Sequence, residues 1–151
     1  MYYVNENIRD LYRVKCTDDR SNVLRLDMNE NPVGLPKEFV ERVKEKIIPE
    51  FLSTYPNKKE LISLIAKNNE IDDANITVTA GSEEAMRLIF QCFGQQGSTL
   101  LTVTPTFEMY DVYSKMFGMQ HEMVEYEEDF SISVDKILEK IRTDTGIIVL
   151  L

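Results

Sequence analysis

The segment "NITVTAGSEEAMRLIF", residues 75–90, decides how this chain is expected to fold. Apolar and polar residues alternate in its first part, "ITVTA" (76–80), which is typical of a β-strand. Gly81 interrupts the alternation, and from Ser82 the apolar residues recur with helical spacing. The segment therefore predicts a strand, a tight turn and a helix that begins at Ser82.

The expected helix runs to Phe93 and turns one apolar side toward a core. The side chains on that side are Ala85, Met86, Ile89 and Phe93. Cys92 lies in the same apolar pattern, so we expect it in the core as well. The glycine turn is thus followed by a helix that needs a partner surface.

Downstream of this segment, strands and helices alternate. Strands are expected over 98–104, 121–126 and 146–151, and helices over 106–117 and 133–141. This alternation is typical of an α/β fold with a mostly parallel sheet and flanking helices.

The last expected strand, "GIIVLL" (146–151), is apolar throughout. Such a run is typical of a strand in the middle of a sheet that is covered on both faces. Left at an edge, it would be an aggregation hazard. We therefore expect the chain to be the N-terminal part of a longer protein. The alternative is that this strand pairs with the others and ends the domain.

Upstream, the segment "LRLDMNENPVGLP" (24–36) is rich in turn-forming residues and predicts an irregular loop. Pro36 then suits the first turn of an amphipathic helix. The apolar residues of this helix are Phe39, Val40, Val43 and Ile47. A turn at Tyr55-Pro56 leads into a second helix whose inward residues are expected to be Leu61, Leu64 and Ile65.

Composition and charge exclude several classes of function. The net charge of −9 argues against a nucleic-acid or anionic membrane surface. The N-terminus lacks the apolar stretch of a signal peptide, and no run approaches transmembrane length. Two cysteines, Cys16 and Cys92, do not form a disulfide framework, so we expect a reduced, cytoplasmic setting.

The turn at Gly81-Ser82-Glu83 is the first candidate site. The N-terminus of a helix offers free backbone N–H groups and partial positive charge, which suit a phosphate. The competing interpretation is a plain helix cap, with the Ser82 hydroxyl as N-cap and Glu83 and Glu84 in the first turn. A nucleotide-binding interpretation is weaker, because the turn has one glycine and no Gly-x-Gly-x-x-Gly or Gly-Lys-Ser/Thr pattern.

Three further stretches are candidates. "VTPTFEMY" (103–110) follows a strand, where open α/β sheets bind ligands, and Phe107 can present a ring face to a planar cofactor or pack on the sheet. Tyr55 stands on a stiff Tyr-Pro turn. "DMNENP" (27–32) is either a functional loop or a plain turn. A hydrolase is not indicated, because His121, the only histidine, lies on an expected strand and no serine has a nucleophile-elbow context.

In their order and spacing these pieces resemble the N-terminal third to half of fold-type-I aminotransferases, which use pyridoxal 5′-phosphate. The resemblance runs from about Leu24 to the end and is strongest to the histidinol-phosphate aminotransferase group. It implies an arm with helices over 1–70 that contributes to the small domain and the dimer contact. It also implies the first half of the cofactor-binding α/β domain over 71–151.

The resemblance also implies roles for individual residues. The backbone turn at Gly81, Ser82 and Glu83 would hold the cofactor phosphate, and Phe107 would stack on the pyridine ring. Phe107 stands where tyrosine is more usual, so the stacking face is kept and the hydroxyl is lost. Tyr55 would reach the phosphate in the neighbouring subunit of a homodimer.

The resemblance further implies that the Asn29 and Glu30 loop lies beside the amino-acid or keto-acid substrate. No residue of the chain matches the family's Schiff-base lysine, so no catalytic residue is assigned and the chain alone is expected to be inactive. Two alternatives stay open. One is an amino-acid-phosphate decarboxylase of the same fold, and the other is a non-catalytic binding module.

Overall fold

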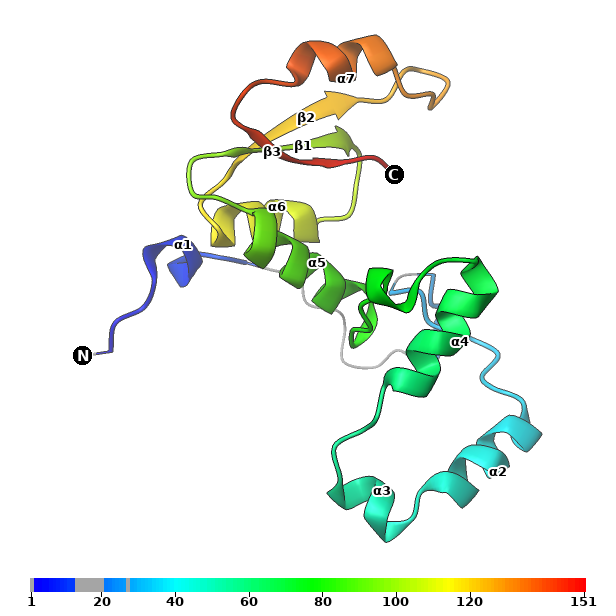
Figure 1. Cartoon of the computed structure of the whole chain (residues 1–151). Helices are drawn as coiled ribbons and strands as arrows, with labels where there is room; N and C mark the ends of the chain where they lie inside the picture. The colour runs from blue at the N-terminus through cyan, green and yellow to red at the C-terminus, as the bar shows by residue number, and fades with distance from the viewer. Residues whose placement is uncertain (1, 13–20, 27) are drawn as a thin grey trace. The chain divides into compact units, whose positions relative to one another are not determined.

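The computed structural model describes residues 2–12, 21–26 and 28–151 (Figure 1). These residues divide into two compact units. The α/β unit comprises Met1–Val14 and Thr79–Leu151, and the helical unit comprises Lys15–Val78. The division expected between residues 70 and 71, with its two domain roles, stays a prediction.

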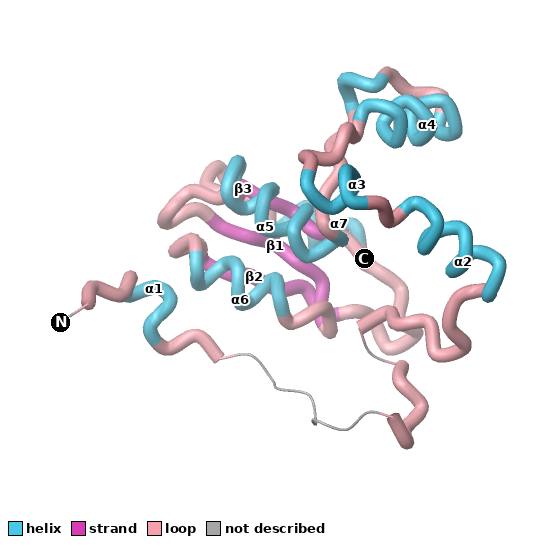
Figure 2. The backbone as a smooth tube through the Cα atoms, turned by 90° about the horizontal axis from the view of Figure 1, so that it is seen from below, coloured by secondary structure: helices cyan, strands magenta, loops and turns pink. Residues whose placement is uncertain are grey.

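The α/β unit contains a three-stranded parallel sheet. Its strands are β1 (Thr99–Thr104), β2 (Gln120–Glu125) and β3 (Thr145–Val149), in the order β2-β1-β3. Figure 2 shows β1 between its two neighbours. Both pairings are parallel, which confirms the expected α/β class and strand direction.

The central strand β1 is buried because apolar layers cover both of its faces. Figure 1 shows helix α7 (Val134–Lys140) on one face, and helices α5 (Gly81–Phe93) and α6 (Met109–Met116) on the other. Leu100 packs on the α5 and α6 side, whereas Leu101 and Val103 pack on the α7 side. Alternate residues of a strand point to opposite faces, so a single apolar run can serve two layers.

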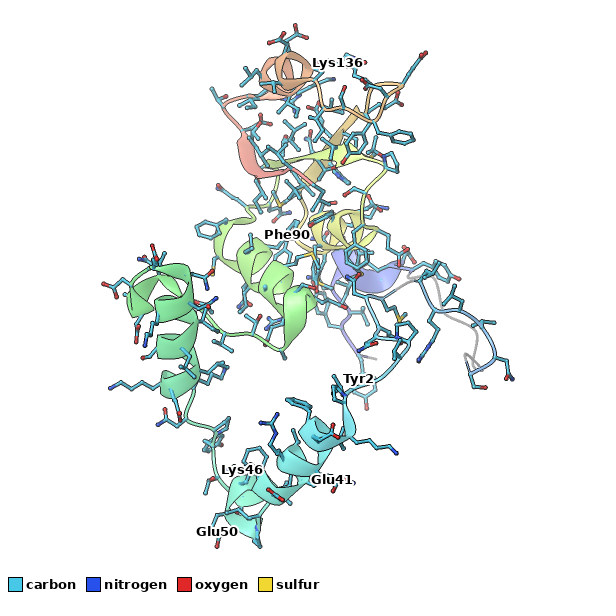
Figure 3. All side chains as sticks on the ribbon, turned by 90° about the vertical axis from the view of Figure 1, so that its right-hand side faces the viewer. Tyr2, Glu41, Lys46, Glu50, Phe90 and Lys136 are labelled. Atoms are coloured by element: carbon cyan, nitrogen blue, oxygen red, sulfur yellow. The ribbon has the colours of Figure 1, made fainter. Side chains whose placement is uncertain are left out.

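Phe90 joins α5 to α6 and to the sheet. Its side chain is fully buried and projects from α5 toward this junction (Figure 3). Its ring stacks on Tyr113, with centroids 5.4 Å apart, and on Phe117 at 6.2 Å. Helix α1 (Glu6–Arg9) packs against α6 within the same unit.

The helical unit contains α2 (Lys37–Lys46), α3 (Pro49–Ser53), α4 (Lys59–Asn69) and the 3-10 turn η1 (Asp73–Asn75). The two expected helices are confirmed as α2 and α4, whereas α3 was not expected. Pro36 is the N-cap of α2 rather than its first helical residue. None of the helices in the described part of the chain is long and apolar enough to span a membrane.

One expectation about an individual segment is wrong. Residues 76–80 form no strand, because no described segment supplies the neighbouring ladder of hydrogen bonds that an extended segment needs. The expectation that "GIIVLL" has further neighbouring strands stays a prediction, because among the described strands it pairs with β1 alone. The segment forms β3 at one edge, where Ile148 is exposed.

The expected buried faces of α4 and α5 are also wrong in part. On α4, Leu61 and Leu64 are exposed, and the buried residue is Ala66. On α5, the buried side is centred on Phe90, because Tyr113 of α6 and Phe117, directly after α6, contact that side. Three α5 residues expected in the core or on its inward side are therefore exposed: Ile89, Cys92 and Phe93. Cys16 lies outside the described residues.

A polar network centred on Arg142 joins β1, β2 and the residue before β3. Arg142 donates from Nη1 to Glu122 Oε1 on β2 at 2.6 Å, from Nε to Asp144 Oδ1 at 3.2 Å, and from Nη2 to Thr99 Oγ1 on β1 at 3.2 Å. The hydrogen bond from Arg142 is the main reason why the pKa of the Asp144 carboxyl lies below its ordinary value. The ionised form of Asp144 is therefore favoured by folding.

This network predicts a pH dependence of stability. Because the folded-state pKa of Asp144 is lowered, its contribution is present above the unfolded-state pKa of about 3.9 and is lost as the pH falls through the lower folded value. We expect Asp144→Asn to unfold more easily than the wild type at pH 6, with the difference vanishing near pH 2. Urea unfolding at a series of pH values measures this, with the exposed Glu139→Gln as the control. A difference that persists unchanged at pH 2 would contradict the assignment.

Candidate functional site

The carboxyl end of β1 leads into a loop that carries the candidate ring-stacking residue. A cis peptide bond joins Thr104 to Pro105, and Phe107 follows before α6 begins. The Phe107 side chain is 45% exposed and meets Tyr110 edge to face, with ring centroids 6.3 Å apart. Phe107 therefore does not pack into the core, and a large part of its ring is accessible to a planar ligand.

Thr106, beside Phe107, carries a polar atom that lacks a partner. Its Oγ1 is buried and makes no hydrogen bond to any of the described residues. Buried hydroxyl groups are nearly always hydrogen-bonded, so an orphaned one needs an explanation. A polar ligand group at this loop would supply the missing partner.

The second half of the candidate site is the start of α5. Gly81 has a φ of +84°, in the left-handed region that side chains disfavour, and a Cβ placed there would have nothing within 4 Å. A side chain at Gly81 would thus meet open space, and this turn precedes the first backbone N–H groups of the helix, which have no carbonyl four residues earlier in the helix to bond. This geometry leaves room for an anion to approach the backbone closely.

The plain-cap interpretation of Ser82 is wrong. Helix α5 begins at Gly81 with Ala80 as its N-cap, and the N-cap side chain makes no capping hydrogen bond. Instead, the Glu84 carboxylate accepts a hydrogen bond from the backbone N–H of Ala80. The helix starts one residue earlier than expected. Ser82 is therefore placed inside the first turn.

The first turn of α5 is locally acidic. Glu83 and Glu84 both lie in it, and Arg87 is the nearby cation. Arg87 places Nη2 3.6 Å from Glu84 Oε1 and donates from Nη1 to Gln91 Oε1 at 3.0 Å. Arg87 is thus engaged along the helix side, so an anion at the turn would need further cations from other residues.

Tyr113 links the two halves of the site. Its hydroxyl on α6 donates to the backbone carbonyl of Glu83 at 3.3 Å, and its ring stacks on Phe90. The helix that follows the Phe107 loop therefore contacts the first turn of α5 directly. The glycine turn and the exposed aromatic ring therefore belong to one connected part of the α/β unit.

The remaining candidate residues belong to the helical unit. Tyr55 lies between α3 and α4 with its side chain fully exposed. Asn29 adopts a left-handed φ of 51° in the loop before α2, and Glu30 pairs with Arg25 at 2.8 Å. The structure confirms that this segment is an irregular loop, while the substrate and cofactor roles of these residues stay predictions.

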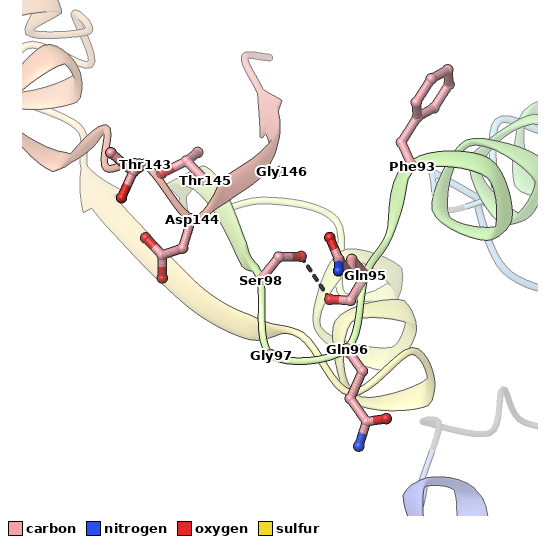
Figure 4. A pocket seen from close by; sticks show the side chains of 9 residues that line it. All are labelled: Phe93, Gln95, Gln96, Gly97, Ser98, Thr143, Asp144, Thr145 and Gly146. Carbon is pink, nitrogen blue, oxygen red and sulfur yellow. Dashed lines mark hydrogen bonds between the residues drawn. The ribbon is translucent and has the colours of Figure 1, made fainter.

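Two hollows of the α/β unit escaped the sequence analysis. One, of about 320 Å³, lies at the amino-terminal ends of β1 and β3 among Gln95, Ser98, Thr143 and Asp144 (Figure 4). Phe107 follows the opposite, carboxyl end of β1. The other has a similar volume and an apolar lining between α5 and β3. Neither has a sequence signal, because each is formed by segments far apart in the chain.

The glycine turn yields a stability prediction. Gly81→Ala should lower the free energy of unfolding by about 1–2 kcal/mol, because a Cβ is strained at this φ although space is available. Ser82→Ala is the matched control and should change it by less than about 0.5 kcal/mol, since no cap hydrogen bond is lost. Urea unfolding of both variants tests the pair. A decrease of about 1 kcal/mol in the free energy of unfolding of Ser82→Ala would instead indicate that Ser82 caps the helix.

Comparison with known proteins places this geometry in a family. The family described as "Aminotransferase class I and II" matches residues 21–151. Histidinol-phosphate aminotransferase from Clostridium novyi (strain NT) is 31% identical over 146 residues, which cover 91% of this chain and 41% of that protein. The enzyme of the same name from Thermoanaerobacter sp. (strain X514) is 32% identical over 121 residues, covering 77% and 34% respectively.

Solved structures agree on the fold. An Erwinia carotovora atroseptica protein, assigned provisionally as a histidinol-phosphate aminotransferase, superposes with a TM-score of 0.72 at 18% identity. The superposition covers 86% of this chain and 38% of that one. The chain thus spans roughly two fifths of the length of these relatives or less. It belongs to the class I and II aminotransferases, a family that depends on pyridoxal phosphate.

Proposed function

We propose that this chain contributes the phosphate turn and the ring-stacking side chain of a pyridoxal phosphate site in an aminotransferase of the histidinol-phosphate type. The full reaction transfers an amino group between an amino acid and a keto acid. One observation carries the proposal: the open Gly81 turn and the exposed Phe107 ring lie in one unit, linked by Tyr113. The resemblance of the chain to enzymes with this name supports the choice of type.

Each residue has a defined task in this proposal. The backbone of Gly81, Ser82 and Glu83 binds the phosphate, since the helix start offers N–H groups and partial positive charge. Phe107 covers one face of the pyridine ring and fixes its plane through stacking. Tyr55 of a neighbouring copy reaches the phosphate in a homodimer.

Asn29 and Glu30 border the substrate in the same proposal. The cofactor, when bound, supplies the electron sink that stabilises negative charge on the substrate carbon. The described residues hold and orient it. In this proposal, cations from outside the first turn of α5 offset Glu83 and Glu84. We place the protein in the cytoplasm on the basis of its cysteine content alone.

The lysine that binds the cofactor covalently also lies outside these residues in our proposal. None of the lysines of the chain occupies a matching position in the motifs. Borohydride reduction of the chain with pyridoxal phosphate, followed by peptide mapping, tests this. We expect scattered, substoichiometric labelling of lysines. One lysine within residues 1–151 that is labelled stoichiometrically would show that the chain carries its own anchor.

The activity itself is tested on the native gene product from the source cells. We expect the protein that contains this sequence to convert histidinol phosphate in the presence of a keto acid. Absence of transamination with this substrate, together with transamination of another amino acid, would change the proposed type. Release of carbon dioxide from an amino-acid phosphate would instead identify a decarboxylase of the same fold.

Phe107→Ala should weaken cofactor binding. Loss of ring stacking worth about 1 kcal/mol corresponds to an affinity roughly five-fold lower. Titration with pyridoxamine 5′-phosphate measures this without side reactions at lysines, because this form lacks the aldehyde. Phe93→Ala is the matched control, an exposed phenylalanine on the same unit that lies at the other edge of the sheet. Equal affinities of the wild type and Phe107→Ala would remove Phe107 from the site.

A further inference from the structure

His121, the only histidine of the chain, is not used by the proposed function. It lies on β2 with its side chain only 8% exposed. Its ring bridges two other elements. Nε2 lies 2.9 Å from Thr102 Oγ1 on β1, and Nδ1 lies 3.4 Å from Asp111 Oδ1 on α6. A single buried side chain thus connects two strands and a helix.

The hydrogen-bond partners favour one form of the neutral ring. The ionised Asp111 carboxylate can only accept, so the proton belongs on Nδ1 and Nε2 accepts from the Thr102 hydroxyl. Burial raises the pKa of Asp111, but the hydrogen bonds from Lys115 and His121 outweigh it, so the pKa lies below its ordinary value. The carboxylate is therefore a stable acceptor for the ring.

The sequence positions of the two partners give this bridge its significance. Thr102 lies two residues before the end of β1, and Asp111 lies in the first turn of α6. The loop 105–108 connects the end of β1 to the start of α6, and it carries Phe107. His121 thus links both ends of the loop that presents the aromatic ring.

A catalytic relay is a different use of the same three residues, and burial excludes it. Thr, His and Asp in hydrogen-bonded order resemble a nucleophile, a base and an orienting acid. However, Thr102 is 1% exposed in the central strand, where the sheet and its helices cover it. A substrate carbon could not reach its hydroxyl without opening the core.

We propose that His121 is a positioning residue, which holds the Phe107 loop in the conformation that stacks on the cofactor ring. This inference rests on the proposed function. With the bridge in place, the end of β1 and the start of α6 keep a fixed separation. The loop between them then has fewer conformations to lose when the ring binds. Without the bridge, Phe107 would pay a larger ordering cost on binding.

A double-mutant cycle with pyridoxamine 5′-phosphate as the probe tests the proposal. In the wild-type background, His121→Leu should lower the affinity about three- to five-fold. In the Phe107→Ala background it should leave the affinity unchanged, because the side chain through which it acts is gone. The loss of thermal stability caused by His121→Leu should be the same in both backgrounds, since the bridge is intact in each parent. An equal loss of affinity in both backgrounds, or no loss in the first, would overturn the proposal.

Conservative variants keep the test usable if His121→Leu does not fold. His121→Asn places an amide N–H near the Nδ1 position and should recover most of the affinity. Thr102→Val removes only the hydrogen bond to His121 Nε2. It should lower the affinity when Phe107 is present and leave it unchanged in the Phe107→Ala background. Full affinity in Thr102→Val together with no recovery in His121→Asn would also contradict the bridge.

The cycle separates this inference from the proposed function. If Phe107→Ala itself leaves the affinity unchanged, the role of Phe107 fails and the positioning role of His121 fails with it. If Phe107→Ala binds more weakly but the two losses are additive, the stacking role stands and only the positioning role is overturned.

Discussion

The burial of β1 on both faces is the constraint on which the α/β unit depends. Its neighbours β2 and β3 satisfy its backbone, Leu100 packs toward α5 and α6, and Leu101 packs toward α7. A buried strand with paired edges cannot shift by one residue, because every side chain would then change face. The carboxyl end of β1 is therefore fixed in space, and with it the point from which the Phe107 loop begins.

The candidate site uses this fixed point in the way that open α/β sheets commonly do. Ligands of such sheets bind at the carboxyl ends of the strands, where loops are free to vary over a rigid base. Here the loop after β1 presents Phe107, and α6 returns to contact the first turn of α5 through Tyr113. The polar network of Arg142 lies at the opposite, amino-terminal ends of the strands. The stabilising Arg142 network and the candidate binding loop thus lie at opposite ends of the strands of one sheet.

Much of the fold could be predicted because its signals are local. The expected bounds of the strands β1, β2 and β3 and of the helices α5 and α7 lie within one or two residues of the observed ones. Alternation and helical spacing indicate such elements directly, because each shows which side is apolar. The expectations that were wrong depend on partners. Residues 76–80 have strand composition without a described neighbour, and Cys92 lies in an apolar pattern on a side of α5 that nothing described covers. For the candidate site, the Gly81 turn and Phe107 were named from sequence and their roles stay predictions, whereas the unpartnered Thr106 hydroxyl and the two hollows had no sequence signal.

The sequence by itself determined the order of the elements from α5 to β3, the parallel α/β class, the glycine at the turn and the family, because these follow from residue types at fixed spacing. The tertiary structure alone decided which face of α5 is buried, that Ser82 is not a cap and that Tyr113 reaches Glu83. It also decided that His121 joins Thr102 to Asp111. The physical reason is the same in each case. A hydrogen bond or a buried face depends on two segments meeting in space, and their separation along the chain leaves no mark in the local pattern of either one.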